Sequence, residues 1–402
     1  MKDIIKIRKD FPFFNQNPDM IYFDNAATTQ KPHPVIDCIT QYYFNYNANV
    51  HRGVYKIAEK ATHEFELTRD LVKDFIGAKN RESIIFTSGA TESINLVVHS
   101  WAKHNLSSGD HILLSQMEHH SNIVPWHMLA RDLDLCIDFI PITNNGELDL
   151  SNIDKLISSK TKLVSIVHQS NVLGTINPIK TIIDKAHQND AVVLIDGAQS
   201  IAHQQIDVDD LDCDFFVFSG HKIYGPTGVG VLYGKPDILD KMQPVFGGGE
   251  MIKEVTNKGF TLNQIPWRFE AGTPPIAEVI ALKEAIKYIS NIGISNIFEY
   301  ENKLIEKAQK KLLNIEGIKI YSPNTNKGPT VTFNISNIHS YDLTKVLDEM
   351  GVAIRSGHHC AQPLMNALEV SSSNRLSLSF YNTEDEVNRF ILKLNKSIDI
   401  LI

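Results

Sequence analysis

Short apolar runs alternate with amphipathic runs from about residue 57 to residue 240, and this alternation restricts the fold more than any other feature of the chain. Helical patterns cover 57–76, which ends at Gly77, about 92–104, and 179–189. Continuous apolar strands between helices indicate a mostly parallel sheet that is covered on both faces. Seven runs have strand-like composition, near residues 84–86, 111–115, 135–142, 162–168, 191–195, 214–218 and 229–233. The sequence therefore predicts an α/β fold with a mostly parallel seven-stranded sheet.

The pattern changes after about residue 275, where two long helical runs cover 276–291 and 295–314. Shorter strand-like runs follow near residues 318–321, 329–335, 352–355 and 375–380. Thr383 with Glu386 three residues later is a capping-box pattern that starts a last helix. We expect an N-terminal segment that packs on the body, a large domain and a smaller α+β domain, with bounds 1–20, 21–275 and 276–402.

A cluster of glycines, Gly247 to Gly249, and the polar stretch 251–268 are expected to form one long loop. The 402 residues carry a net charge of -8 without a dense Lys/Arg run, which disfavours nucleic-acid and anionic-membrane partners. No stretch approaches the ~18 apolar residues of a membrane span. The charged N-terminus lacks the apolar core of a signal peptide, so we expect a cytoplasmic location.

Lys222 ends the strand-like run that begins at Asp214 and directly precedes the glycine-rich turn Gly225–Gly228. A buried amine at a strand end is costly unless it has a partner or a task. One such task is a Schiff base with an aldehyde cofactor, because the surroundings can lower the pKa of the amine. The alternative is a lysine whose long side chain reaches solvent from the strand end. This segment alone does not separate the two interpretations.

Asp196 ends the apolar run Val192–Ile195, and Gln199 follows three residues later. Parallel α/β sheets bind ligands at the carboxyl ends of their strands. A carboxylate there would suit a protonated pyridine nitrogen and make the ring a better electron sink, and Gln199 could reach a phenolic oxygen on the same ring. Alternatively, Asp196 caps the next helix.

The segment from Ser88 to Glu92 is a second strand-to-helix junction, at which small residues such as Ala90 let backbone N–H groups approach an anion. Thr91 adds a hydroxyl donor, and Ser219 and His221 would add further donors, so the set suits a monophosphate. No Walker A lysine or G-x-G-x-x-G pattern is present here, which makes a nucleotide a poorer candidate. A plain helix N-cap is the alternative.

His119 follows the strand near 111–115, where its imidazole could stack on an aromatic cofactor or transfer protons. A metal site that uses His119 and His120 is disfavoured, because adjacent residues of an extended segment point in opposite directions and no matching ligand spacing is present. Asn171 follows the strand near 162–168. Polar groups at four strand ends, His119, Asn171, Asp196 and Lys222, together predict a site for an aldehyde-phosphate cofactor.

The chain has four cysteines without a Cys-x-x-Cys pair, a disulfide framework or a zinc spacing. Cys38, Cys136 and Cys213 are interpreted as small buried apolar residues. Cys360 differs, because it lies in a loop between strands of the smaller domain and is flanked by Arg355 and two histidines. Such partly exposed, electropositive surroundings lower the pKa of a thiol and favour the thiolate.

The residues at these positions resemble those of pyridoxal-phosphate enzymes of the class V aminotransferase group, which have fold type I, and more narrowly the SUF-type, group II cysteine desulfurases. The resemblance runs nearly end to end, from the Tyr22–Ala27 segment to the final helix. Its most specific stretches are Asn49–Gly53, Glu118–Trp126, Asp196–Gln199, Ser219–Gly228, Arg268–Pro274 and Arg355–Cys360.

The resemblance implies a role for each matched residue. Lys222 holds pyridoxal 5'-phosphate covalently, Asp196 pairs with the pyridine nitrogen, Gln199 with the ring oxygen, and His119 stacks on the ring. The phosphate is held by Ala90, Thr91, Ser219 and His221, and by Thr273 of the other subunit of a homodimer. The residues implied in substrate binding are Asn171, Arg375, Arg355 and His51.

The resemblance also implies that Cys360, Lys222 and His119 are catalytic: L-cysteine becomes L-alanine, and the sulfur stays on Cys360 as a persulfide. A SufE- or SufU-like acceptor would then take the sulfur toward iron–sulfur cluster assembly. Selenocysteine lyase activity at the same site is the nearest alternative, because selenium leaves more readily than sulfur and can dispense with Cys360. Class V transamination and a non-catalytic sulfur carrier are more distant alternatives.

Overall fold

The structure is a computed structural model, which describes residues 4–402, so the first three residues of the predicted N-terminal segment lie outside the described residues. Helices α1 (Ile4–Lys9) and α2 (Pro12–Gln16) pack on the body. Arg8 forms an ion pair of 2.8 Å with Glu386, and Phe11 between the two helices is fully buried.

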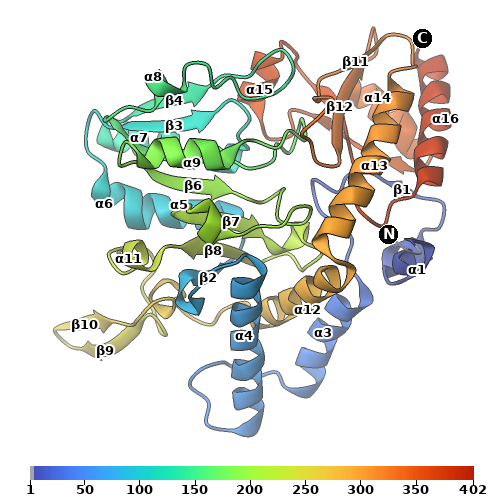
Figure 1. Ribbon diagram of the computed structural model, residues 1–402. Helices are drawn as coiled ribbons and strands as arrows, with labels where there is room; N and C mark the ends of the chain where they lie inside the picture. Colours follow the sequence, from blue (N-terminus) through green and yellow to red (C-terminus); the bar gives the residue numbers. More distant parts are fainter. Residues whose placement is uncertain (1–3) are drawn as a thin grey trace.

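A seven-stranded sheet forms the centre of the larger part of the molecule (Figure 1), in the order β2-β8-β7-β6-β5-β3-β4. Its strands are β2 (Ile84–Thr87), β3 (His111–Ser115), β4 (Cys136–Ile140), β5 (Thr161–Val167), β6 (Val192–Asp196), β7 (Phe215–Ser219) and β8 (Gly230–Gly234). Only β8 runs against its neighbours. The link from β7 to β8 is too short for a crossover helix, and such a link joins strands antiparallel. The predicted mostly parallel seven-stranded sheet is confirmed.

Apolar side chains cover both faces of this sheet, which explains the continuous apolar strands of the sequence. Along β7, Phe216 and Phe218 join one core cluster, whereas Phe215 and Val217 join the other. The first cluster includes residues of α4 (Lys56–Phe75), α9 (Ile179–His187) and α12 (Ile276–Ile292), and the second includes residues of α5 (Ala90–Val97) and α7 (Val124–Leu133). Further helices are α3 (His33–Asn45), α6 (Lys103–Asn105), α8 (Ile153–Leu156), α10 (Val208–Leu211) and α11 (Pro236–Leu239).

The smaller part contains an antiparallel sheet in the order β11-β12-β15-β14. Its strands are β11 (Ile318–Ile320), β12 (Thr330–Ile335), β14 (Arg355–Gly357) and β15 (Ser373–Ser377). Helices α13 (Ile294–Leu312), α14 (Ser340–Glu349) and α16 (Glu384–Leu401) complete a separate core. The predicted capping box is confirmed, since the Thr383 side chain accepts from the Glu386 N–H and the Glu386 side chain accepts from the Thr383 N–H.

Two segments cross the predicted domain bounds, which themselves stay predictions. Strand β1 (Ile21–Tyr22) pairs with β13 (Val352–Ala353), and Ile21 belongs to the core of the smaller part. Helix α12 contributes instead to a core cluster of the large sheet, although it follows residue 275. Packing of distant segments produces both exceptions, and local composition carries no signal for it.

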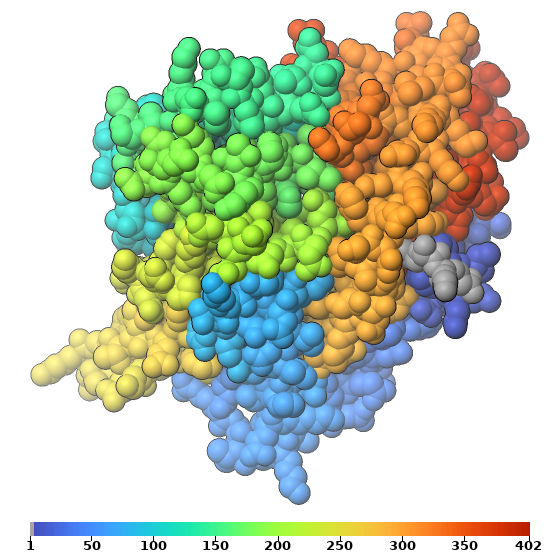
Figure 2. Space-filling model, viewed as in Figure 1, coloured from blue at the N-terminus to red at the C-terminus, as the bar shows by residue number. Residues whose placement is uncertain are grey.

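The expectation of a long loop over 251–268 is wrong in part, because strands β9 (Ile252–Thr256) and β10 (Gly259–Leu262) form an antiparallel hairpin. The hairpin projects from the body in Figures 1 and 2. Most of its residues are exposed, so its sequence lacks the apolar alternation that marks a half-buried strand. Val255 and Phe260 stand opposite each other and are 66% and 60% exposed.

The cysteines differ more than the sequence predicts. Cys213 is buried and Cys38 is partly buried, but Cys136 is exposed, so the prediction for Cys136 is wrong. Strand β4 is an edge strand, which leaves part of its surface uncovered. Within residues 4–402, none of the helices combines the length and the apolar character that crossing a membrane requires.

A buried ion pair fastens the segment after the hairpin to the large sheet. Arg69 of α4 is 1% exposed and donates to both carboxylate oxygens of Glu270, at 2.7 and 2.9 Å. Glu270 also accepts a 2.7 Å hydrogen bond from the backbone N–H of Phe86 in β2. Removal of the guanidinium would leave a buried carboxylate without its cation.

We therefore expect Arg69→Met to lower the free energy of unfolding by ~3–5 kcal/mol, the usual effect of breaking a buried pair from one side. The matched control is Arg81→Met, whose side chain is 39% exposed and pairs with Glu66 and Asp70. Its effect should stay within ~1 kcal/mol. Urea unfolding of both variants measures the difference, and equal losses would contradict the assignment.

Candidate active site

A cavity of about 250 Å³ lies where the carboxyl ends of several parallel strands meet the smaller part. It brings together the predicted residues Ala90, Thr91, His119, Asn171, Asp196, Ser219, His221, Lys222, Arg355, Cys360 and Arg375. It is also lined by residues that were not predicted as site residues, namely Ala26, Ala27, Ser121, Ala198 and His359. All four predicted strand-end groups therefore reach one space, as the topology of a parallel sheet requires.

Lys222 and Asp196 stand at the ends of the neighbouring strands β7 and β6 and influence each other's charge. Burial lowers the pKa of the Lys222 amine, against the raising effect of Asp196. Burial raises the pKa of the Asp196 carboxyl, which Lys222 partly offsets. Asp196 is 3% exposed and accepts a 2.9 Å hydrogen bond from the Ala198 N–H, which leaves capacity for a cationic N–H of a ligand.

The junction at α5 presents N–H and hydroxyl groups at one end of the cavity. The Ala90 N–H donates to the Ser219 hydroxyl at 2.9 Å, and Thr91 lines the cavity beside it. A Cβ at Gly230 would lie 2.4 Å from the Gly89 Cα, so β8 must carry a glycine where it passes this turn. Backbone and hydroxyl donors at a helix start suit an anion such as a phosphate.

His119 is held in one orientation and as a neutral imidazole. Burial and the charge of Lys222 lower its pKa to about 3. Its Nδ1 accepts from the Ser121 N–H at 3.1 Å, so the proton of the neutral ring is assigned to Nε2. The ring therefore suits stacking or proton transfer without carrying a charge at neutral pH.

Glu118 precedes His119 in this segment, and the sequence pattern predicted no role for it. It is fully buried and accepts hydrogen bonds from the Asn122 side chain at 2.7 Å and the Val167 N–H at 3.0 Å. Burial raises its pKa to about 8. The carboxyl thus connects the segment that carries His119 to β5, a contact that no motif in the sequence indicated.

Two arginines face the cavity from paired positions of β14 and β15. Arg355 stands opposite Arg375 in the register, and both line the cavity. Arg375 is 2% exposed and donates to Asp24 at 2.7 Å and to the backbone oxygen of Asn171 at 3.0 Å, while its Nε has no acceptor. The side-chain oxygen of Asn171 also has no donor. This end of the cavity suits a carboxylate that carries an ammonium group nearby.

The loop of Cys360 connects β14 to α15 (Gln362–Ala367), a helix rather than the predicted strand. His120 clamps the loop, since its backbone N–H donates to the backbone oxygen of Cys360 at 2.7 Å and its side-chain Nε2 accepts from the Gln362 N–H at 3.1 Å. His359 and Cys360 have φ angles of 53° and 56°, a left-handed turn of two side-chain-bearing residues. The clamp and the turn together bring the partly buried Cys360 to the wall of the cavity.

Three predicted residues lie outside the cavity wall. Gln199 donates to the backbone oxygen of Ala26, a residue of the wall, at 2.9 Å. His51 and Thr273 line a separate cavity of about 180 Å³, and His51 contacts Glu66 at 2.9 Å. Within one chain, neither His51 nor Thr273 contributes to the space around Lys222.

Comparisons with known proteins identify the family of the chain. The sequence matches the family described as Aminotransferase class-V over residues 21–390. The cysteine desulfurase of Wigglesworthia glossinidia brevipalpis is 48% identical over 398 residues, which cover 98% of this chain and 97% of that protein. The apo structure of the cysteine desulfurase from Thermococcus onnurineus NA1 has a TM-score of 0.94 and 40% identity, covering 98% of both chains. The cysteine desulfurase CsdA from Escherichia coli, in an S-sulfonic acid form, has a TM-score of 0.94 and 34% identity, covering 100% of both chains.

The chain therefore belongs to the class V aminotransferase family of proteins. Within that family, the relative and the two solved structures named above, at 34–48% identity, are cysteine desulfurases. The fold-type I architecture predicted from the sequence is confirmed by these neighbours.

The His120 clamp leads to a prediction about the exposure of Cys360. We expect His120→Ala to raise the alkylation rate of Cys360 by iodoacetamide about fivefold. The variant loses the hydrogen bond from the Gln362 N–H to the imidazole, which is worth ~1 kcal/mol, so the loop opens more often. The control is His358→Ala, an exposed neighbour on the same loop. Peptide mapping by mass spectrometry follows Cys360 separately. A rate in His120→Ala equal to that of the control would show that the clamp does not hold the loop.

Proposed function

We propose that the chain converts L-cysteine to L-alanine with pyridoxal phosphate as cofactor and retains the sulfur as a persulfide on Cys360. The observation that supports this most strongly is that the thiol of Cys360, the amine of Lys222 and the carboxyl of Asp196 line one cavity. An ordinary aminotransferase has no need of a thiol there. The names of the relatives and structural neighbours support the same reaction.

The residues of the cavity fit pyridoxal phosphate. Lys222 offers an amine of lowered pKa for the aldehyde, Asp196 a buried acceptor for the pyridine N–H, and His119 a neutral ring for stacking. Donors for the phosphate are the Thr91 and Ser219 hydroxyls and the backbone at Ala90. When bound, the cofactor supplies an electrophilic carbon for the substrate amine and a ring that stabilises negative charge at Cα.

Different side chains of the cavity then orient the substrate, remove its proton and accept its sulfur. Arg355, Arg375 and Asn171 orient the substrate carboxylate, and the Lys222 amine or His119 removes the Cα proton. The Cys360 thiolate attacks the substrate sulfur and forms an S–S bond. The C–S bond breaks, its electron pair stays on carbon and takes a proton, and L-alanine leaves.

Subunit and partner contacts belong to the same proposal. The separate position of Thr273 and His51 would let both reach the site of a second copy, which supports a homodimer. Phe44, Val54 and Tyr55 are apolar side chains that a single chain leaves 80%, 92% and 53% exposed. We further propose a cytoplasmic location and a SufE- or SufU-like protein as the sulfur acceptor for iron–sulfur cluster assembly.

Cys360→Ala should lower alanine production from L-cysteine by roughly three orders of magnitude or more, because the sulfur then has no nucleophile to accept it. Cys136→Ala, which removes an exposed thiol of an edge strand, should keep normal activity. Alanine and sulfide are measured with and without candidate acceptor proteins. Multiple turnovers at the normal rate in Cys360→Ala would reject the role of this thiol.

The same two variants, assayed on selenocysteine and with ketoacids, separate the alternatives. A Cys360→Ala protein that fails on cysteine but processes selenocysteine would have selenocysteine lyase activity in addition. Exchange of amino groups with a ketoacid, insensitive to Cys360→Ala, would instead indicate class V transamination.

Borohydride reduction of the holoenzyme should place the pyridoxyl label on Lys222, whose amine lines the cavity. Lys31 is an informative comparison, because burial lowers its pKa to about 7, yet its amine donates to the backbone oxygens of Thr29 and His221. Peptide mapping distinguishes the two lysines. A label on Lys31, or an undiminished label in Lys222→Ala, would refute the assignment of Lys222.

A further inference from the structure

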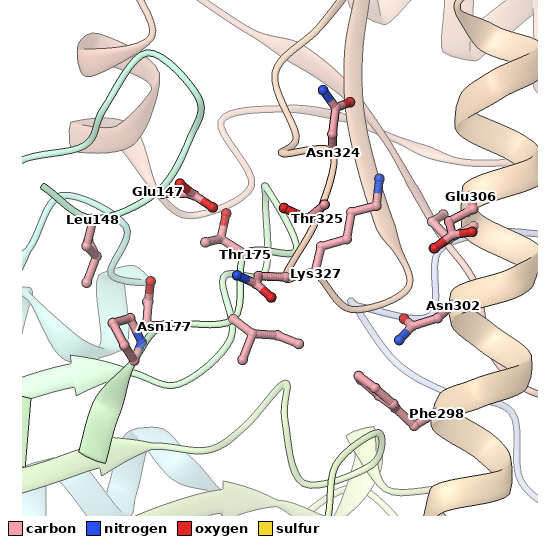
Figure 3. Close-up of a pocket in the computed structure, with 14 residues that line it drawn as sticks. Glu147, Leu148, Thr175, Asn177, Phe298, Asn302, Glu306, Asn324, Thr325 and Lys327 are labelled. Atoms are coloured by element: carbon pink, nitrogen blue, oxygen red, sulfur yellow. The ribbon is translucent and has the colours of Figure 1, made fainter. Parts of the chain in front are cut away.

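A second cavity, of about 620 Å³, is larger than the one around Lys222 and lies between the two parts of the molecule. Helix α13 and the loop from Asn324 to Lys327 form its walls on the side of the smaller part, and Glu147, Leu148 and the segment from Thr175 to Pro178 form the other side. Figure 3 shows the side chains of both sides around the opening. Its volume is in the range of cavities that bind small molecules.

Lys327 is the unusual residue of this cavity. It is 6% exposed, and among the contacts of residues 4–402 its amine has neither a hydrogen bond nor an ion pair. Burial lowers its pKa to about 8, which the charge of Glu306 opposes only partly. The backbone that carries this side chain is held in place. Lys327 forms a β-bridge with Thr175, and the backbone oxygen of Asn326 accepts from the Ile176 N–H at 2.8 Å. The amine nitrogen is not fully enclosed and has no anion of its own, so an anion in the cavity could reach it.

Two amide side chains of the wall also have unused capacity. The side-chain oxygens of Asn177 and Asn302 are buried without a donor, although the Asn177 amide nitrogen donates to the Val167 oxygen at 2.8 Å. Apolar surface comes from Leu148 and Phe298. The wall therefore offers one cation and an apolar surface, and a side-chain rotation would turn the two enclosed amide oxygens toward the cavity. Glu147 and Glu306 disfavour a highly charged anion.

We propose that this cavity is a second ligand site, which binds a small monocarboxylate that carries a hydroxyl or amino donor and an apolar side group. The carboxylate pairs with Lys327, the donor approaches the amide oxygens, and the apolar group covers Leu148 and Phe298. This inference does not depend on the proposed function, because none of these residues lines the cavity of Lys222.

The test uses the cofactor-loaded protein and 2-hydroxyisocaproate, which has a carboxylate, a hydroxyl and an apolar group but no amine that could react with the cofactor. Calorimetric titration compares the wild type with Lys327→Met and with Lys310→Met, a matched control on the exposed side of α13. 4-Methylpentanamide serves as the uncharged control ligand. We expect binding to the wild type and Lys310→Met alike, and about tenfold or greater loss in Lys327→Met, since a paired charge is removed.

A second measurement needs no variant. Acylation of lysines in the wild type, followed by peptide mapping, should slow about tenfold at Lys327 when the probe concentration is about ten times its Kd, with Lys310 unaffected. Absence of binding, binding that persists in Lys327→Met, or an unchanged acylation rate at Lys327 would each overturn the proposal. Persistent binding would place the carboxylate elsewhere, for example at Arg355 and Arg375.

Discussion

The buried guanidinium of Arg375 holds together three parts of the chain that are distant in sequence. It lies on β15 of the smaller sheet, donates to Asp24 after β1, and donates to the Asn171 backbone of the larger part. Because a buried guanidinium without partners is very costly, these contacts must form together. The cavity exists only when both parts are docked in this arrangement, so its chemistry depends on tertiary contacts as much as on the residues that line it.

Most of the fold could be predicted from the sequence because buried strands and helices have characteristic patterns of apolar residues. The inner strands of the large sheet are apolar on both faces, and Thr383 with Glu386 marks the start of α16 by local hydrogen bonding alone. The hairpin of β9 and β10 lacked that pattern, because solvent covers it on most sides. The position of α12 and the exposure of Cys136 depend on which elements pack against each other. The periodicity of apolar residues along the sequence does not contain that information.

The candidate site divides in the same way. Residues at strand ends, such as His119, Asp196 and Lys222, could be predicted to meet because the carboxyl ends of parallel strands share one edge. Asp24 and His120 form hydrogen bonds with residues that are more than 200 positions away in the sequence, and Glu118 forms its hydrogen bonds in the protein interior. No spacing in the sequence reveals such contacts. Lys327 likewise appears ordinary in the sequence, and only its surroundings show that its amine is unpaired.

The position of Cys360 on the smaller part has a consequence for how the protein would lose activity on partial unfolding. The thiol is supplied by the smaller part, whereas Lys222 and Asp196 belong to the larger sheet. Loosening of the smaller part would withdraw Cys360, the proposed sulfur acceptor, while Lys222 and Asp196 stay in place. Partial denaturation would thus produce a protein that retains the cofactor-binding groups of the larger part and has lost the reaction, so cofactor content alone would overstate how much of a preparation is intact.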